Sequence, residues 1–137
     1  MELSRLSTLA WKHIRNAAAE EMYLNSGYDG TKPVTFYGLV NERCNVKCRY
    51  CEYWRLKHYA TEMTIEEWKS ALTSVKDFVG AYSINFSGGE PFIKPGFIDL
   101  LGWCYNNGVS AGVTTNGSAL TARNAAKVVA ASPFNIN

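Results

Sequence analysis

Segments with the character of strands alternate with helix-like segments along most of this 137-residue chain. Three short runs are rich in β-branched and aromatic residues, and each is followed by a stretch whose apolar residues recur at helical spacing. The strand-like runs are residues 34–40 (VTFYGLV), 82–87 (YSINFS) and 109–115 (VSAGVTT). Such alternation with short connections predicts parallel strands joined by right-handed helical crossovers, so the expected fold class is α/β.

The best-marked helix is predicted to begin just after Thr64. Thr64 and Glu67 form the Thr-x-x-Glu pattern of a capping box. Apolar residues at positions 65, 68, 72, 75 and 79 then line one face, and Gly80 supplies a stop signal. We therefore expect a helix over about residues 65–79.

Two more helices and one partial strand are predicted in the second half of the chain. Pro95 is expected to open a helix that Gly108 closes, and residues 121–131 (TARNAAKVVAA) are expected to form the next helix. Cys104 falls on the apolar face of the first of these, so we expect it in the core. The last four residues (FNIN) indicate the start of a fourth strand.

The N-terminal segment is predicted to be an amphipathic helix over residues 3–25, ended by Gly27 and Gly30. We expect it to dock on the rest of the protein. A helix lying on a membrane surface is disfavoured, because its basic residues are few and acidic residues interrupt them. The expected organisation is an N-terminal helix and linker over 1–30, followed by a core domain over 31–137.

Charge and composition exclude several classes of function. There are 14 Lys and Arg residues against 12 Asp and Glu residues, so charge alone gives no reason to expect a nucleic-acid partner. No apolar run approaches the roughly 20 residues of a membrane span, and the N-terminus lacks the apolar core of a secretory signal. We expect a cytoplasmic protein with reduced thiols, which favours metal ligation over disulfides.

The loops that follow the three predicted strands hold the residues that could bind a metal or a ligand. Cys44, Cys48 and Cys51 follow the first strand with CxxxCxxC spacing, SGGEP (87–91) follows the second, and TNG (115–117) follows the third. Ligands of parallel βα arrays bind at the carboxyl ends of the strands. All three motifs are therefore expected at one edge of the sheet.

Three closely spaced thiols leave two interpretations open. A four-iron cluster usually takes four cysteines, so three would leave one iron free to bind the amine and carboxylate of another molecule. Alternatively, His58 would complete a Cys3His zinc site. The GGEP and TNG motifs disfavour zinc, because such a site has no use for them.

Taken together, the motifs resemble those of the radical S-adenosylmethionine (radical SAM) superfamily. The shared features are CxxxCxxC with Tyr50 before the last cysteine, then GGEP, then TNG, in that order over residues 34–137. The resemblance implies a partial (β/α) barrel of the radical SAM type, with about three βα units and the start of a fourth strand, preceded by an N-terminal helix. The family's usual core has six such units, so we expect the N-terminal half of that domain, as a fragment of a longer enzyme or as a truncated protein.

The resemblance also implies a role for each motif residue. Cys44, Cys48 and Cys51 would bind three irons of a [4Fe-4S] cluster, and the amino and carboxylate groups of S-adenosylmethionine would chelate the fourth. The expected cofactor-binding residues are Tyr50 near the adenine, Gly88, Gly89 and Glu90 at the methionine amino group, and Asn116 in the same pocket. An electron from a flavodoxin or ferredoxin would cleave the cofactor to a 5′-deoxyadenosyl radical that abstracts hydrogen, an oxidoreductase type of chemistry. No catalytic residue is identified beyond the cluster.

The substrate is not determined by these motifs. A peptide or a small metabolite is favoured, because GGEP followed by TTNG is common in the branch of the family that modifies them. A truncated, non-catalytic module that binds an iron–sulfur cluster is the alternative. Made alone, a chain that stops inside a strand is expected to be marginally stable and to associate through its open edge.

Overall fold

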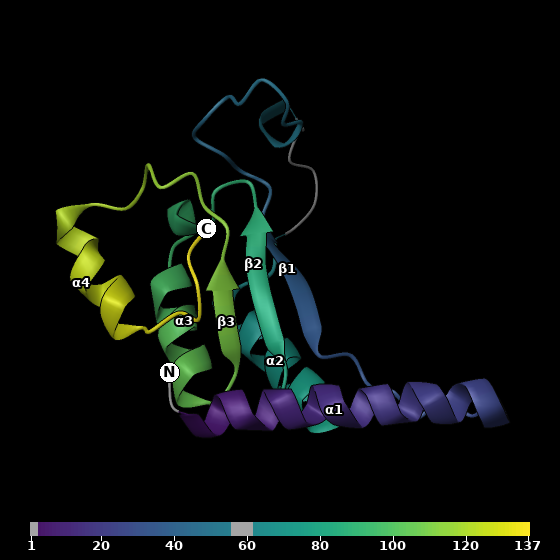
Figure 1. Ribbon diagram of the computed structural model, residues 1–137. Coiled ribbons are helices and arrows are strands. Elements are labelled where there is room, and N and C mark those ends of the chain that lie inside the picture. Colours follow the sequence, from purple (N-terminus) through teal and green to yellow (C-terminus); the bar gives the residue numbers. More distant parts are fainter. Residues whose placement is uncertain (1–2, 56–61) are drawn as a thin grey trace.

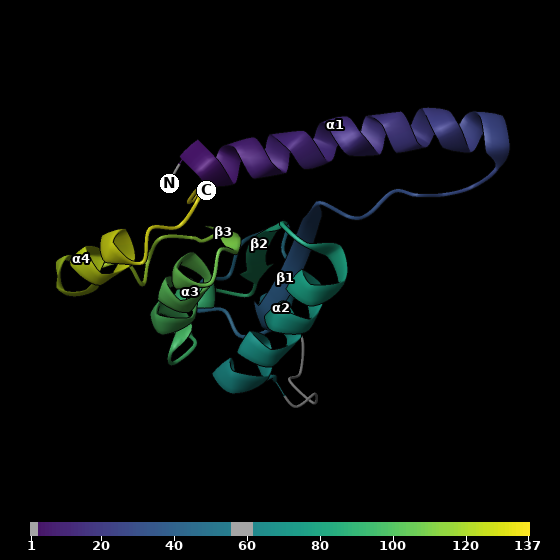
Figure 2. The same ribbon diagram turned by 90° about the horizontal axis from the view of Figure 1, so that it is seen from below.

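A computed structural model describes residues 3–55 and 62–137 of the chain. Its centre is a parallel three-stranded sheet in the order β1-β2-β3 (Figure 1), formed by Thr35–Asn41, Ser83–Gly88 and Ser110–Val113. Helices α2 (Ile65–Val79) and α3 (Phe97–Asn106) connect successive strands and cover the same face of the sheet (Figure 2). This confirms the predicted α/β class with parallel strands.

The helix after Thr64 forms as its sequence signals predict. The Thr64 hydroxyl accepts a hydrogen bond from the Glu67 backbone N–H at 3.2 Å, and the Glu67 carboxylate accepts one from the Thr64 backbone N–H at 2.7 Å. These reciprocal bonds satisfy two backbone donors that a helix start leaves free. Gly80 ends the helix with a φ of 77°.

A core of apolar side chains fills the space between the sheet and the two helices α2 and α3. The ring of Phe86 on β2 packs edge-to-face against Trp68 and Phe97, each at 5.5 Å between ring centroids. Cys104 is completely buried in this core, and burial raises the pKa of its thiol to about 12. Its predicted place in the core is confirmed, and a thiol with such a high pKa stays protonated at neutral pH.

Helix α3 begins later than Pro95 indicates. Residues 91–93 form a short 3-10 helix, and Gly96 then adopts a φ of 80° before the first helical residue, Phe97. A side chain at Gly96 would lie 2.9 Å from the side chain of Ile65 on α2. The left-handed conformation at Gly96, which glycine adopts without strain, therefore sets the start of the helix.

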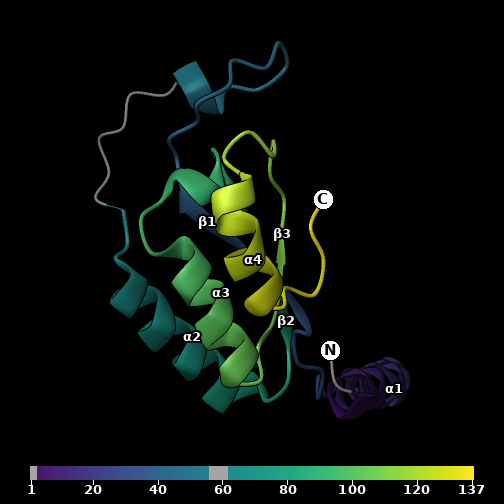
Figure 3. The ribbon, with the colours of Figure 1, turned by 90° about the vertical axis from the view of Figure 1, so that its left-hand side faces the viewer.

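The end of the chain runs beside β3. Helix α4 (Ala122–Ala130) packs beside α3 (Figure 3). Beyond it, Val113 donates to the Asn135 carbonyl at 3.0 Å and accepts from the Asn137 N–H at 2.9 Å. These bonds form one parallel bridge between Val113 and Ile136, so the start of a fourth strand is present as expected.

The N-terminal helix α1 (Leu3–Ser26) docks through a lysine. Lys12 is only 5% exposed, whereas Ile14 on the predicted apolar face is 60% exposed. The Lys12 ammonium donates to the carbonyls of Pro33, Val79 and Ala81 at 2.8–2.9 Å. Helix α1 therefore lies across the amino-terminal ends of the strands (Figures 1 and 2). The expected docking is confirmed, and it uses the face that carries Lys12, because a cation is favoured at the carbonyls near the end of α2.

The Lys12→Met variant should detach α1. Methionine keeps most of the apolar stem but leaves three partly buried carbonyls without a donor, which costs about 1–3 kcal/mol for each such group that water does not reach. We expect a lower thermal midpoint and faster proteolysis at the 27–31 linker. Arg15→Met, an exposed cation on the same helix, is the matched control. Equal midpoints for Lys12→Met and the parent protein would show that Lys12 does not hold the helix.

In the part of the chain that the structure describes, no helix is both long enough and apolar enough to cross a bilayer.

Candidate functional site

The loops that follow β1, β2 and β3 lie together at the carboxyl edge of the sheet, opposite α1 (Figure 1). Hydrogen bonds connect them: Glu90 after β2 is bonded to Arg43 in the cysteine loop and to Asn116 after β3. The predicted convergence of the three motifs is therefore present in the structure.

The three cysteines of the first loop are free thiols. Cys44 and Cys51 are half-buried and Cys48 is exposed, and none of them forms a disulfide. The backbone turns between Cys48 and Cys51, whose N–H donates to the Cys48 carbonyl at 3.2 Å, and the Trp54 indole donates to the same carbonyl at 3.0 Å. Two of the three cysteines are thus partly shielded from solvent, and the third is exposed.

A site for a single metal ion is not assembled in residues 3–55 and 62–137: no three His, Cys, Asp or Glu side chains are gathered closely enough to hold one. His58, the fourth ligand of the zinc alternative, lies outside the described residues, as does Tyr59 of the segment after the cysteine loop. The CxxxCxxC spacing is also compatible with a multi-iron cluster, in which each cysteine would bind a different iron.

Gly88 and Gly89 allow the second loop to lie directly against the first. A Cβ atom on Gly89 would lie 1.9 Å from the Arg43 carbonyl oxygen, and one on Gly88, whose φ is 121°, would lie 2.2 Å from the Asn41 carbonyl oxygen. The backbone N–H groups of Gly89 and Glu90 donate to these same two carbonyls at 3.0 and 2.8 Å. The glycines are thus required by the chain's own packing, and their contact with a cofactor stays a prediction.

Glu90 joins the second loop to the third. Its side chain is fully buried, and one carboxylate oxygen accepts from the Phe92 N–H at 3.0 Å and from the Thr115 hydroxyl at 2.7 Å. The other oxygen accepts from the Asn116 N–H at 2.8 Å. A carboxylate has about four acceptor positions, so three bonds leave room for one more donor. Direct contact with an ammonium group stays a prediction.

Asn41, at the end of β1, was missed by the sequence analysis. Its side-chain nitrogen donates to the Glu90 carbonyl at 3.0 Å, and the residue is 2% exposed. Its amide oxygen is buried and has no hydrogen-bond partner over the residues that the structure describes. A buried unpaired acceptor is costly unless something satisfies it. The only signal in the sequence was a polar residue at the end of the first predicted strand, three positions before Cys44.

Asn116 in the third loop contacts the cysteine loop. Its side-chain nitrogen lies 3.7 Å from the Cys44 sulfur and 3.1 Å from the Asn45 side-chain oxygen. Asn45 in turn donates to the Ser118 hydroxyl at 2.9 Å. Asn45 and Ser118 were not predicted, and their signal was only that each is a small polar residue beside a motif residue.

An ion cluster anchors the start of the cysteine loop. Arg43 binds both carboxylate oxygens of Glu62, at 3.2 and 3.1 Å, and Lys94 donates to Glu62 at 3.3 Å. Burial by itself raises the pKa of Glu62, but the hydrogen bonds to the two cations outweigh it and lower that pKa. The residue before Cys44 is therefore tied to the segment that precedes α3.

Tyr50 extends away from the other motif residues. Its side chain is 90% exposed, and the Arg49 guanidinium lies 5.6 Å from its ring centroid. The ring is therefore accessible to a ligand. Its contact with adenine stays a prediction, because it concerns the ligand-bound state.

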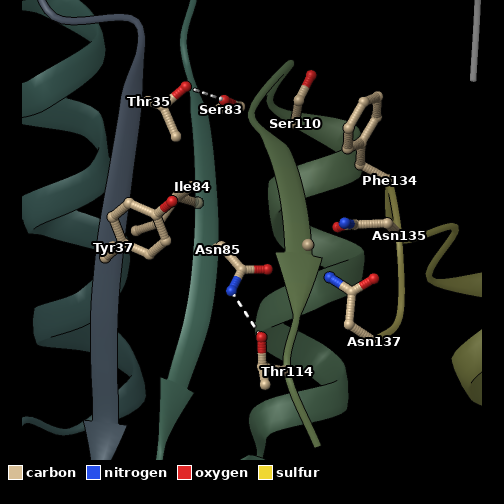
Figure 4. Close-up of a pocket in the computed structure, with 11 residues that line it drawn as sticks. Thr35, Tyr37, Ser83, Ile84, Asn85, Ser110, Thr114, Phe134, Asn135 and Asn137 are labelled. Atoms are coloured by element: carbon tan, nitrogen blue, oxygen red, sulfur yellow. Dashed lines mark hydrogen bonds between the residues drawn. The ribbon is translucent and has the colours of Figure 1, made fainter.

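A polar cavity of about 450 Å³ lies on the sheet face opposite α2 and α3 (Figure 4). Asn85 points into it and donates to the Thr114 hydroxyl at 2.8 Å, while its amide oxygen has no partner in the part of the chain that the structure describes. None of its lining residues carries a charge: Thr35, Tyr37, Ser83, Ile84, Asn85, Ser110, Gly112, Thr114, Phe134, Asn135 and Asn137. The sequence signal was the alternation of polar and apolar residues in β2, which directs Ser83 and Asn85 to the same face of the sheet.

Comparison with known proteins identifies the arrangement. The family described as the Radical SAM superfamily matches residues 39–137, and its members use a [4Fe-4S] cluster and S-adenosylmethionine. The chain is 30% identical over 81 residues to an S-adenosylmethionine-dependent nucleotide dehydratase of Selenomonas ruminantium, covering 59% of this chain and 29% of that protein. It is 34% identical over 87 residues to a PqqA peptide cyclase of Streptomyces rochei, covering 63% and 24%.

The fold also matches solved structures. The crystal structure of BtrN in complex with AdoMet and 2-DOIA superposes with a TM-score of 0.66 at 22% identity, covering 77% of this chain and 45% of BtrN. At that identity the likeness shows the fold alone, and it confirms the partial barrel. The chain spans less than a third of the length of the two curated relatives.

Proposed function

Because this chain belongs to the radical SAM superfamily, we propose that its carboxyl-edge site holds a [4Fe-4S] cluster and S-adenosylmethionine. Cys44, Cys48 and Cys51 are the proposed iron ligands, and the fourth iron is left for the cofactor. The catalytic activity proposed is that of a radical SAM enzyme, carried out by this chain or by a longer protein that contains it.

The two bound groups would supply an electron and a sulfonium C–S bond whose cleavage yields methionine and a hydrogen-abstracting 5′-deoxyadenosyl radical. The chain's own contribution is binding and orientation. The three thiols give up their protons when they bind iron. The buried carboxylate of Glu90 would place negative charge beside an ammonium group bound at this edge. The bare backbone at Gly88 and Gly89 keeps side chains out of the space beside them.

The observation that carries the proposal is the bonded contact among the three loops. Glu90 connects the GGEP loop to the backbone of Asn116, and the side chain of Asn116 contacts Cys44. A zinc site or a non-catalytic cluster module would need the cysteine loop only. The additional buried carboxylate at this edge favours a site that also binds a second, positively charged group.

The substrate is proposed to occupy the polar cavity on the open sheet face. Its lining side chains are uncharged but rich in hydroxyl and amide groups. Such a surface favours neutral groups that both donate and accept hydrogen bonds, such as peptide amides or the hydroxyls of a small metabolite. The name of one relative, a PqqA peptide cyclase, is consistent with a peptide.

An electron donor is part of the same proposal. Cys48 is the exposed member of the three cysteines, and Lys47 and Arg49 flank it in the sequence. An acidic redox protein of the flavodoxin or ferredoxin kind would be attracted to these cations. We also propose that residues 31–137 form the core domain and that residues 1–30 supply the helix that closes its opposite end.

Anaerobic reconstitution with iron and sulfide followed by EPR spectroscopy tests the function. We expect about four irons per chain and a reduced-cluster spectrum that changes when S-adenosylmethionine is added, because the cofactor would bind the open iron. If the cluster's EPR spectrum does not change when the cofactor is added, the result would support a non-catalytic iron–sulfur module. A colourless protein that retains zinc would support the zinc alternative instead.

A further inference from the structure

We propose that Asn116 is a hydrogen-bond donor to the Cys44 thiolate and that this contact raises the reduction potential of the bound cluster. The inference rests on the proposed function, since it requires a cluster on the three cysteines. Its basis is the 3.7 Å approach of the Asn116 side-chain nitrogen to the Cys44 sulfur. Such a bond makes Asn116 a positioning residue that acts through an iron ligand.

The orientation of the Asn116 amide is determined by its neighbours. Its oxygen accepts from the Ser118 backbone N–H at 2.9 Å and from the Ser118 hydroxyl. A rotated amide would point its nitrogen at that backbone N–H, so the nitrogen must face the opposite way. Its two N–H groups then have separate partners, the Asn45 oxygen at 3.1 Å and the Cys44 sulfur.

The backbone of Asn116 is held by the loop that follows β2. Its N–H donates to the fully buried carboxylate of Glu90 at 2.8 Å, and the preceding Thr115 hydroxyl donates to the same carboxylate at 2.7 Å. Gly117 follows with a φ of 73°, which turns the chain toward Ser118. The donor is therefore fixed in place by β2 and β3 before any ligand arrives.

A donor to a coordinating sulfur draws negative charge away from it. A reduced cluster carries one more electron than an oxidised one, so the bond stabilises the reduced state and raises the potential. Within the part of the chain that the structure describes, Asn116 gives Cys44 a side-chain donor that the sulfur atoms of Cys48 and Cys51 do not have. The effect should therefore act through the iron bound by Cys44.

Redox titration of the reconstituted protein, followed by EPR, tests the inference. In Asn116→Ser the shorter side chain cannot reach Cys44, but its hydroxyl still accepts from the Ser118 N–H. We expect the equilibrium constant for cluster reduction to fall about tenfold, which is a potential about 59 mV more negative for a one-electron couple. Asn116→Asp, which keeps the shape and loses the donor, should also shift the potential downward.

Two matched controls separate the thiolate contact from loop geometry. Asn45→Ala removes the other partner of the Asn116 nitrogen and leaves the sulfur contact, and Asn106→Ala lies on α3 away from the site; both should keep the parent potential. An unchanged potential in Asn116→Ser with full iron content would overturn the inference, as would an equal shift in Asn45→Ala. Either result would leave the proposed function standing, whereas a parent protein that assembles no cluster would refute both.

Discussion

The Cys48→Ala variant should bind no four-iron cluster. Three cysteines are the smallest set proposed to hold it, and two ligands leave two irons without protein thiolates. We expect iron content after anaerobic reconstitution to fall from about four per chain to background, with loss of the brown absorbance. We expect little change in stability, because Cys48 is exposed and its loss would leave no buried cavity.

Cys104→Ala is the matched control, because it removes a thiol of the same kind from the core. Cys104 is completely buried and burial raises its pKa to about 12, so it is a structural residue. We expect full iron content and a lowered thermal midpoint, the reverse of the Cys48→Ala result. Retention of the cluster by Cys48→Ala, or its loss in Cys104→Ala, would refute the ligand assignment.

The Gly89→Ala variant should separate the second loop from the cysteine loop. The added methyl group would lie 1.9 Å from the Arg43 carbonyl oxygen, a distance that no relaxation of a flexible side chain can relieve because the atom is backbone. Moving the loops apart breaks the hydrogen bonds of Gly89 to Asn41 and of Glu90 to Arg43. We expect a loss of stability at or above the roughly 3 kcal/mol upper range for overpacked sites, together with poor cluster assembly.

Gly102→Ala on α3 makes the same chemical change where there is space. Its added Cβ would come no closer than 4.0 Å to the side chain of Ala131, and alanine is favoured over glycine inside a helix by up to about 1 kcal/mol. Chemical denaturation and iron analysis of both variants provide the measurement. If Gly89→Ala were as stable as Gly102→Ala, the close approach of the two loops would not hold in solution.

The sequence was sufficient to predict the main helices and strands and the meeting of the three motif loops. Capping signals at Thr64 and Glu67 are local, so they specified the start of α2 correctly. The meeting of the three motif loops followed from topology, since the carboxyl ends of neighbouring parallel strands must lie at one edge. The roles of the individual motif residues stay predictions, because they concern ligands.

Contacts between distant segments could not be predicted in the same way. The docking role of Lys12 was not predicted, because helical periodicity describes one helix and not the carbonyls of Val79 and Ala81 that meet it in the fold. The role of Gly89 in packing the two loops was missed for a similar reason, since nothing local shows that the Arg43 carbonyl lies against it. The alternation of polar and apolar residues in β2 was visible, but it defines a cavity only when the strands are aligned.

The buried carboxylate of Glu90 has a consequence for how a ligand associates with this edge. Its bonds to Phe92, Thr115 and Asn116 order two loops within the unliganded fold. Conformational entropy that a mobile loop would lose on binding has therefore already been lost on folding, so a larger part of each contact appears as affinity. Such preorganisation predicts lock-and-key association at this edge, with little backbone rearrangement between the free and bound states.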